Sequence, residues 1–137
     1  MIPIKQTLFD IKKGNCFQAC IASIFELSLE SVPNFIAMKN WEEKLDKWLE
    51  QFDCYYLELT LEKSQANTLK GYHLIGGKHS SGIPHITVGL NGKMIHDPHP
   101  DNEGLCSPLD DCEGKYCYGI FVNRNQCPEL LRDIFKK

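Results

Sequence analysis

The sequence has little of what directs a chain into a membrane or onto a nucleic acid. Its longest apolar stretches fall far short of the ~20 residues that a membrane-spanning helix needs. Basic residues form no run, and the net charge is −3, so we expect neither a nucleic-acid partner nor a membrane partner. Residues 1–6 do not place an apolar segment after a basic one, so we expect no secretory signal and a cytoplasmic protein.

Internal repeats and low-complexity segments are also missing from the chain. The length of 137 residues is typical of one domain, and an apolar content of 42% suffices for one hydrophobic core. We therefore expect residues 1–137 to form a single domain.

Cysteine, by contrast, is abundant, with seven residues. The number is odd, so at least one thiol is unpaired within the chain. A reducing cytosol keeps thiols free, and a buried free cysteine usually acts as a small apolar side chain. The seven are Cys16, Cys20, Cys54, Cys106, Cys112, Cys117 and Cys127.

Two helices are expected in the first half of the chain. Residues 15–26 are apolar on nearly every side, which is typical of a buried helix, and Asn15 is a candidate N-cap whose side chain accepts a backbone N–H bond. A turn and a short helix are expected over residues 27–33. Residues 40–52 form an amphipathic pattern whose two tryptophans we interpret as core residues.

The second half of the chain has the alternation typical of strands. We expect strands over residues 55–61, 71–76, 85–90, 93–97 and 116–122. Asn91-Gly92 suits a two-residue hairpin turn. A short C-terminal helix is expected over residues 128–135. Helices followed by an antiparallel sheet indicate the α+β class.

Three residues in this arrangement suit nucleophilic chemistry. Cys16 begins a helix, where free backbone N–H groups favour a thiolate and stabilise an oxyanion. His85 begins a strand and Asp97 ends the next one, so the hairpin brings them close if a bulge adjusts the register. A histidine beside a thiol moves its proton, and a carboxylate beside that histidine fixes the tautomer.

These residues resemble those of the papain-like cysteine peptidases, and more closely the double-glycine-leader peptidases attached to bacteriocin exporters. Residues 16–20 read CFQAC, residues 84–88 read PHITV, and Asp97 precedes a proline. Small bacterial and phage proteins have similar patterns. The resemblance implies a papain-like fold with Cys16 as nucleophile, His85 as general acid/base and Asp97 as the residue that orients His85.

The resemblance also implies a glutamine in the oxyanion hole, and its position is where this chain departs from the family. In the family, a glutamine lies six residues before the cysteine, where this chain has Asp10. Gln6 lies ten residues before Cys16, and we expect a longer loop to bring it to the site.

The expected function is that of a thiol-dependent hydrolase, a cysteine peptidase that cleaves a peptide or isopeptide bond through a thioester, with a peptide or protein substrate and no cofactor. An acyltransferase of the transglutaminase-like kind has the same triad, and a papain-like binding module that has lost catalysis is the other alternative. The sequence leaves the acceptor, the substrate and the oligomeric state open.

A zinc site is a further alternative in the acidic loop expected over residues 99–115. His96 and His99 are separated by two residues, and three cysteines follow: Cys106, Cys112 and Cys117. Structural zinc sites use ligand pairs two to four residues apart, and these cysteines are spaced more loosely. We therefore expect no metal. We interpret the loop as a lid beside the cleft, whose acidic residues would favour basic or peptide-like substrates.

Overall fold

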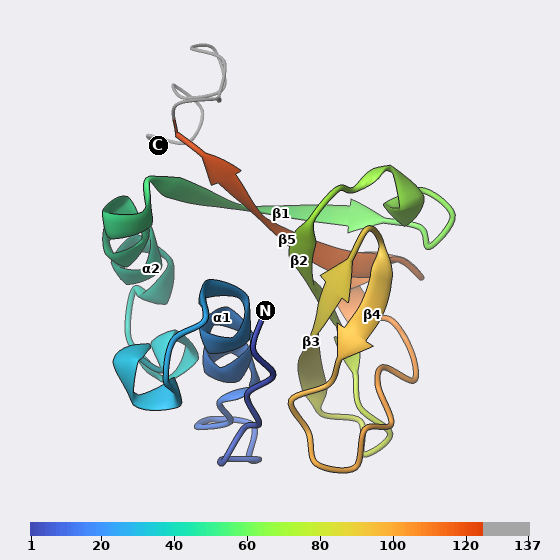
Figure 1. Cartoon of the computed structure of the whole chain (residues 1–137). Helices are drawn as coiled ribbons and strands as arrows, with labels where there is room; N and C mark the ends of the chain where they lie inside the picture. The colour runs from blue at the N-terminus through green and yellow to red at the C-terminus, as the bar shows by residue number, and fades with distance from the viewer. Residues whose placement is uncertain (125–137) are drawn as a thin grey trace.

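The computed structural model describes residues 1–124, so the helix expected over residues 128–135, and Cys127, lie outside the described part. The chain is α+β (Figure 1). Its main elements are α1 (Cys16–Phe25), α2 (Trp41–Leu49), β1 (Cys54–Leu61), β2 (Tyr72–Lys78), β3 (Pro84–Leu90), β4 (Lys93–His96) and β5 (Tyr116–Asn123). The short 3-10 helices are η1 (Leu29–Ser31), η2 (Phe35–Ala37), η3 (Glu50–Phe52), η4 (Ala66–Thr68) and η5 (Asp110–Cys112).

The five strands form one antiparallel sheet in the order β1-β5-β2-β3-β4. The last strand of the chain, β5, therefore lies between β1 and β2. This confirms the α+β prediction and the expected strands, with bounds that differ by a few residues. The order of the strands was not predictable from local patterns, because β5 pairs with strands that are far away in the sequence.

The main core lies between the helices and one face of the sheet. Helix α1 packs against β3, and α2 packs against β1. Five apolar residues of α1 are fully buried, as expected for a helix that is apolar on most sides: Phe17, Ala19, Cys20, Ile21 and Ala22. Trp41 and Trp48 pack against this core from α2, which confirms their interpretation as core residues.

The β3–β4 hairpin has the predicted turn and one irregularity. Asn91 and Gly92 have φ angles of 52° and 91°, as a type I′ turn requires. Leu90 pairs with Lys93, but the register then shifts, so that Val88 pairs with His96. This bulge supplies the adjustment that brings Asp97, directly after β4, next to the start of β3.

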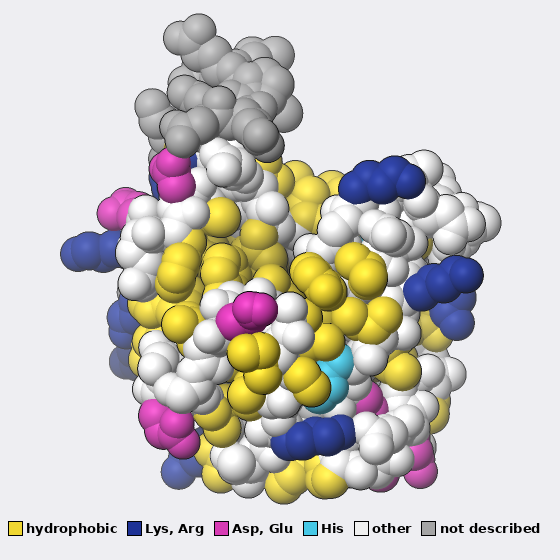
Figure 2. Space-filling view, viewed as in Figure 1, with side chains coloured by type: hydrophobic (Ala, Val, Ile, Leu, Met, Phe, Trp, Pro, Cys, Tyr) yellow, Lys and Arg dark blue, Asp and Glu magenta, His cyan; other side chains and the backbone are white. Residues whose placement is uncertain are grey.

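Hydrophobic side chains gather near the centre of the face shown in Figure 2, between the helical side and the sheet side. Lysine and arginine side chains are scattered over this face and form no continuous patch (Figure 2). The apolar surface on this face is therefore concentrated along the boundary between the helices and the sheet.

Replacing Gly89 with alanine should lower the free energy of unfolding by about 2 kcal/mol. A Cβ atom there would overlap the fully buried ring of His73, which accepts a hydrogen bond from the Gly92 N–H at 2.9 Å and so is held in place. Gly76→Ala is the matched control, because its Cβ would meet Cys117 at an ordinary 3.6 Å. Urea unfolding measures both variants, and equal losses would contradict this account.

Candidate active site

Asn15 anchors the start of α1, but not in the way the sequence predicts. Its side chain forms no capping bond to the helix, so that expectation was wrong. Instead, its Oδ1 atom accepts bonds from the N–H groups of Thr7 and Leu8 at 2.9 and 2.8 Å, and its Nδ2 atom donates to Thr7 Oγ1. The buried amide thereby joins the N-terminal segment to the residue that precedes Cys16.

This arrangement leaves the first turn of α1 without a side-chain cap. The Ala19 N–H bonds to the Asn15 carbonyl at 3.0 Å, which is the first backbone bond of the helix. The N–H groups before it, including that of Cys16, are the ones a helix cannot satisfy internally. They give the surroundings of Cys16 a partial positive charge and offer donors to an anion.

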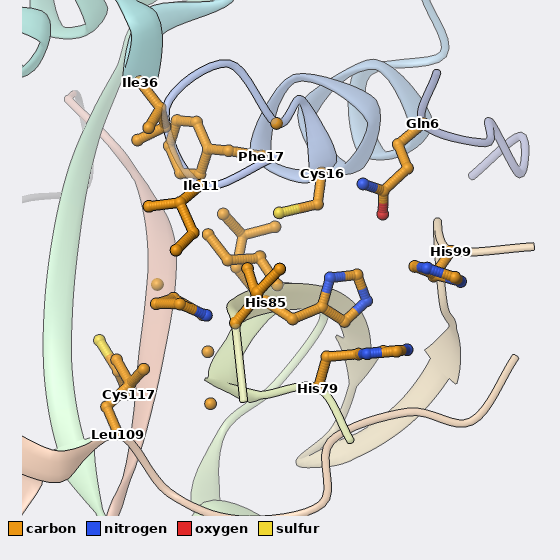
Figure 3. A pocket seen from close by; sticks show the side chains of 18 of the residues that line it. Gln6, Ile11, Cys16, Phe17, Ile36, His79, His85, His99, Leu109 and Cys117 are labelled. Carbon is orange, nitrogen blue, oxygen red and sulfur yellow. The ribbon is translucent and has the colours of Figure 1, made fainter. Parts of the chain in front are cut away.

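His85 and Asp97 form a buried pair at the other side of the site. His85 Nε2 lies 2.6 Å from Asp97 Oδ1, and the two residues are 4% and 3% exposed. The carboxylate also accepts the His99 N–H at 2.9 Å and the Gly104 N–H at 2.8 Å. Because the carboxylate only accepts, Nε2 donates to it, and Nδ1 is left for Cys16, which lies near the ring in the same cavity (Figure 3).

The pKa values of this pair move in opposite directions. Burial by itself would raise the pKa of Asp97, but hydrogen bonds from His85, His99 and Gly104 outweigh it and lower the pKa to about 2. Burial would lower the pKa of His85, but hydrogen bonds to Asp97 and Cys16, and their negative charge, raise it to about 9. His85 is therefore an imidazolium near neutral pH.

Gln6 lies beside Cys16 and lines the same cavity (Figure 3). Its backbone N–H donates to the Pro98 carbonyl at 3.0 Å, and its side-chain Nε2 donates to the Leu8 carbonyl at 2.9 Å. The side chain is 7% exposed, and its Oε1 atom has no hydrogen-bond partner. The longer loop between Gln6 and Cys16 thus delivers the glutamine to the site, as expected.

The cavity has a volume of about 480 Å³, and its lining has a polar part and an apolar part. Cys16, His85 and Gln6 lie together along one part of it. Apolar side chains line another part: Phe9, Ile11, Phe17, Ile36, Leu74, Ile83 and Leu109. Such a cleft with a few convergent polar groups is typical of a small-molecule or peptide site.

The residues considered for zinc do not assemble in the described part of the chain. His96 Nε2 bonds to the Ile4 carbonyl at 2.7 Å, and Cys106, Cys112 and Cys117 are free thiols outside any metal-like cluster among residues 1–124. All six described cysteines are free thiols, as expected.

The structure groups His99 with a residue that the sequence analysis did not select. His79, in the loop after β2, stacks on His99 with ring centroids 4.4 Å apart, and both line the cavity. No local pattern pointed to His79, because its partners lie about twenty residues further along the chain.

Comparisons with protein-family models, curated proteins and solved structures find no match for this chain. None of the helices in residues 1–124 has the length and apolar character needed to cross a membrane.

The stability of the protein should fall at both ends of the pH range. Asp97 stabilises the fold fully above its ordinary pKa of 3.8, and this contribution of about 2 kcal/mol is lost as the pH falls toward about 2. His85 stabilises the fold fully below its ordinary pKa of 6.5, and its contribution is lost as the pH rises through about 9.

Urea unfolding across pH measures both effects. In Asp97→Asn the loss between pH 4 and 2 should shrink, and the alkaline loss should move to lower pH because His85 has lost its carboxylate. Asp110→Asn, which removes an exposed carboxylate paired with Lys78, is the control. An acid profile that is unchanged in Asp97→Asn would show that other carboxylates determine it.

Proposed function

We propose that the protein is a thiol-dependent hydrolase of papain-like type that cleaves a peptide or isopeptide bond. Cys16 is the nucleophile, His85 the general acid/base and Asp97 the residue that orients His85. One observation carries the proposal: a buried imidazole lies 2.6 Å from a carboxylate through Nε2 and lines the same cavity as the thiol at a helix N-terminus, which helps to raise the pKa of His85.

In the first half of the reaction, the Cys16 thiolate attacks the carbonyl carbon of the amide and forms a carbon–sulfur bond. The carbonyl π electrons move to the oxygen, which becomes an oxyanion. When this intermediate collapses, the carbon–nitrogen bond breaks, and His85 gives its Nδ1 proton to the leaving amine. The products of this half are a free amine and a thioester on Cys16.

In the second half, the neutral His85 takes a proton from water, and the resulting hydroxide attacks the thioester carbonyl. The carbon–sulfur bond breaks, and a carboxylic acid leaves. The Cys16 thiolate and the His85 imidazolium are thereby restored. Throughout, Asp97 holds the ring in place and balances its positive charge.

The oxyanion has two candidate donors beside Cys16. The first is the Cys16 N–H, one of the uncapped groups of α1. The second is Gln6 Nε2, which has two protons and donates only one of them to Leu8. Donors fixed in this way before the reaction act on the charge as it develops, without reorganisation.

The cleft favours a peptide or protein substrate that has an apolar side chain near the scissile bond. Phe9 and Ile11, which line it, are 45% and 71% exposed and offer apolar surface to a bound chain. The loop after β4 contributes acidic groups near the cavity, among them Asp101 and Glu103, whose carboxylates lie beside the cavity-lining His79. These charges suit a basic residue elsewhere in the substrate.

Iodoacetamide labelling with site mapping tests the nucleophile directly. Cys16 should react much faster than the other thiols, because it lies at a helix N-terminus in the same cavity as the His85 imidazolium. His85→Ala should remove that advantage, because the imidazolium that stabilises the thiolate is gone. An inert Cys16 in the folded protein would favour the binding-module interpretation.

Replacing Cys16 with alanine should abolish cleavage of any peptide found by screening a library, while the melting temperature changes little, since Cys16 is only half-buried. Cys20→Ala is the matched control one turn along α1. Its side chain is fully buried, so its loss should lower the stability by about 1 kcal/mol and leave Cys16 reactive. A large loss of stability in Cys16→Ala would instead indicate a packing role.

A further inference from the structure

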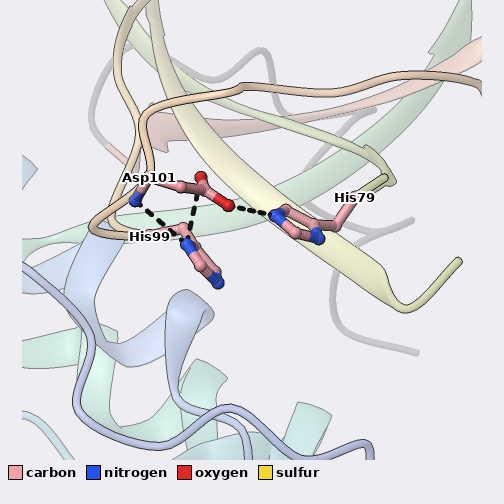
Figure 4. A group of neighbouring side chains, drawn as sticks. All are labelled: His79, His99 and Asp101. Carbon is pink, nitrogen blue, oxygen red and sulfur yellow. Dashed lines mark hydrogen bonds and ion pairs between the residues drawn. The ribbon is translucent and has the colours of Figure 1, made fainter. Parts of the chain in front are cut away.

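Two histidines and an aspartate converge at the rim of the cleft (Figure 4). His79 comes from the loop that follows β2, and His99 and Asp101 come from the loop that follows β4. The Asp101 carboxylate lies between the imidazoles: Oδ2 is 2.7 Å from His79 Nε2, and Oδ1 is 3.0 Å from His99 Nδ1. Both histidines thus direct a ring nitrogen at the same carboxylate.

The geometry of this cluster is close to that of a metal site. One ligand atom from each of the three residues lies within 4.8 Å of the others. Zinc binds nitrogen and oxygen at about 2.0–2.1 Å, so tetrahedral ligand atoms lie about 3.3 Å apart. The observed contacts of 2.7 and 3.0 Å need only a small opening to admit a cation in place of the proton between His79 and Asp101. His99 Nδ1 accepts the Asp101 N–H at 3.2 Å, so it already carries the lone pair that a metal ligand needs.

The surroundings also suit a cation. Glu103 Oε2 lies 3.8 Å from His79 Nε2 and adds a second carboxylate. The side chains of His79, His99 and Asp101 are 12%, 24% and 30% exposed, so one side remains open to water. Three protein ligands and an open position for water form a common zinc arrangement.

We propose that His79, His99 and Asp101 bind a divalent transition-metal ion, of which zinc fits the ligand set best. The ligands come from two loops, so the bound ion joins them. Without it, the two loops meet here through polar side-chain contacts, including Ser80 Oγ with Glu103 Oε2.

The ion would also act on the candidate catalytic pair. The loop that supplies His99 and Asp101 also supplies the two N–H groups that hold Asp97, from His99 and Gly104. Fixing this loop therefore fixes the carboxylate that orients His85. The rings of His79 and His99 lie 5.7 and 5.9 Å from that of His85, so the ion is adjacent to the catalytic histidine rather than part of the triad.

Titration calorimetry with Zn²⁺ on the whole chain carrying Cys16→Ser tests the proposal. The serine removes the thiolate that would compete for zinc, and it makes the test independent of any activity. The Cys16→Ser protein should bind Zn²⁺. Adding His79→Gln or, separately, Asp101→Asn should weaken the Zn²⁺ affinity at least about tenfold, since loss of even a residue that only hydrogen-bonds a metal ligand lowers metal affinity about 10–100-fold. Asp110→Asn, an exposed loop carboxylate outside the cluster, should bind like the Cys16→Ser protein.

Co²⁺ absorption then separates this site from the remaining cysteines, because thiolate ligands add a strong near-ultraviolet band that nitrogen and oxygen ligands lack. Zinc binding that both variants weaken, together with a Co²⁺ spectrum free of that band, supports the site. Binding that neither variant weakens, a thiolate-type spectrum, or no binding overturns it. These outcomes leave Cys16 alkylation unaffected as a test of the proposed hydrolase.

Discussion

The buried pair of His85 and Asp97 is the interaction on which the rest of the site depends. A carboxylate that is 3% exposed needs several donors to remain ionised, and this one receives three, from the His85 ring and from the N–H groups of His99 and Gly104. The pair therefore sets the orientation of the imidazole and also the course of the loop after β4. Removing His85 would leave the buried carboxylate with only the two backbone donors, and removing Asp97 would take away a partner that raises the pKa of His85.

The helix that carries Cys16 is placed by a different set of contacts. Its apolar faces pack between α2 and the sheet, which fixes its axis, and the Asn15 amide binds residues 7 and 8, which fixes the chain that leads into it. Because Asn15 is used in this way, the helix N-terminus is left without a side-chain cap. The same residue thus secures the loop that carries Gln6 and exposes the donors beside the thiol.

The rim histidines relate the cleft to the loops around it. His79 and His99 stack beside His85, and their shared carboxylate belongs to the loop whose backbone holds Asp97. A change in the contacts of His99 or Asp101 would therefore reach the His85–Asp97 pair through the one short segment that follows β4. The loop after β4 therefore has a structural role, because its backbone holds the Asp97 carboxylate.

The sequence by itself determined the helices and strands and predicted a role for three residues. The period of the apolar residues defined α1, α2 and the strands, the Asn-Gly turn defined the hairpin, and the types and order of Cys16, His85 and Asp97 indicated a triad. Tertiary structure decided what depends on distant contacts: the position of β5 inside the sheet, the bulge that brings Asp97 to His85, the use of the Asn15 side chain, and the pairing of His79 with Asp101. Local patterns do not encode these, because each is set by packing between segments far apart in the chain.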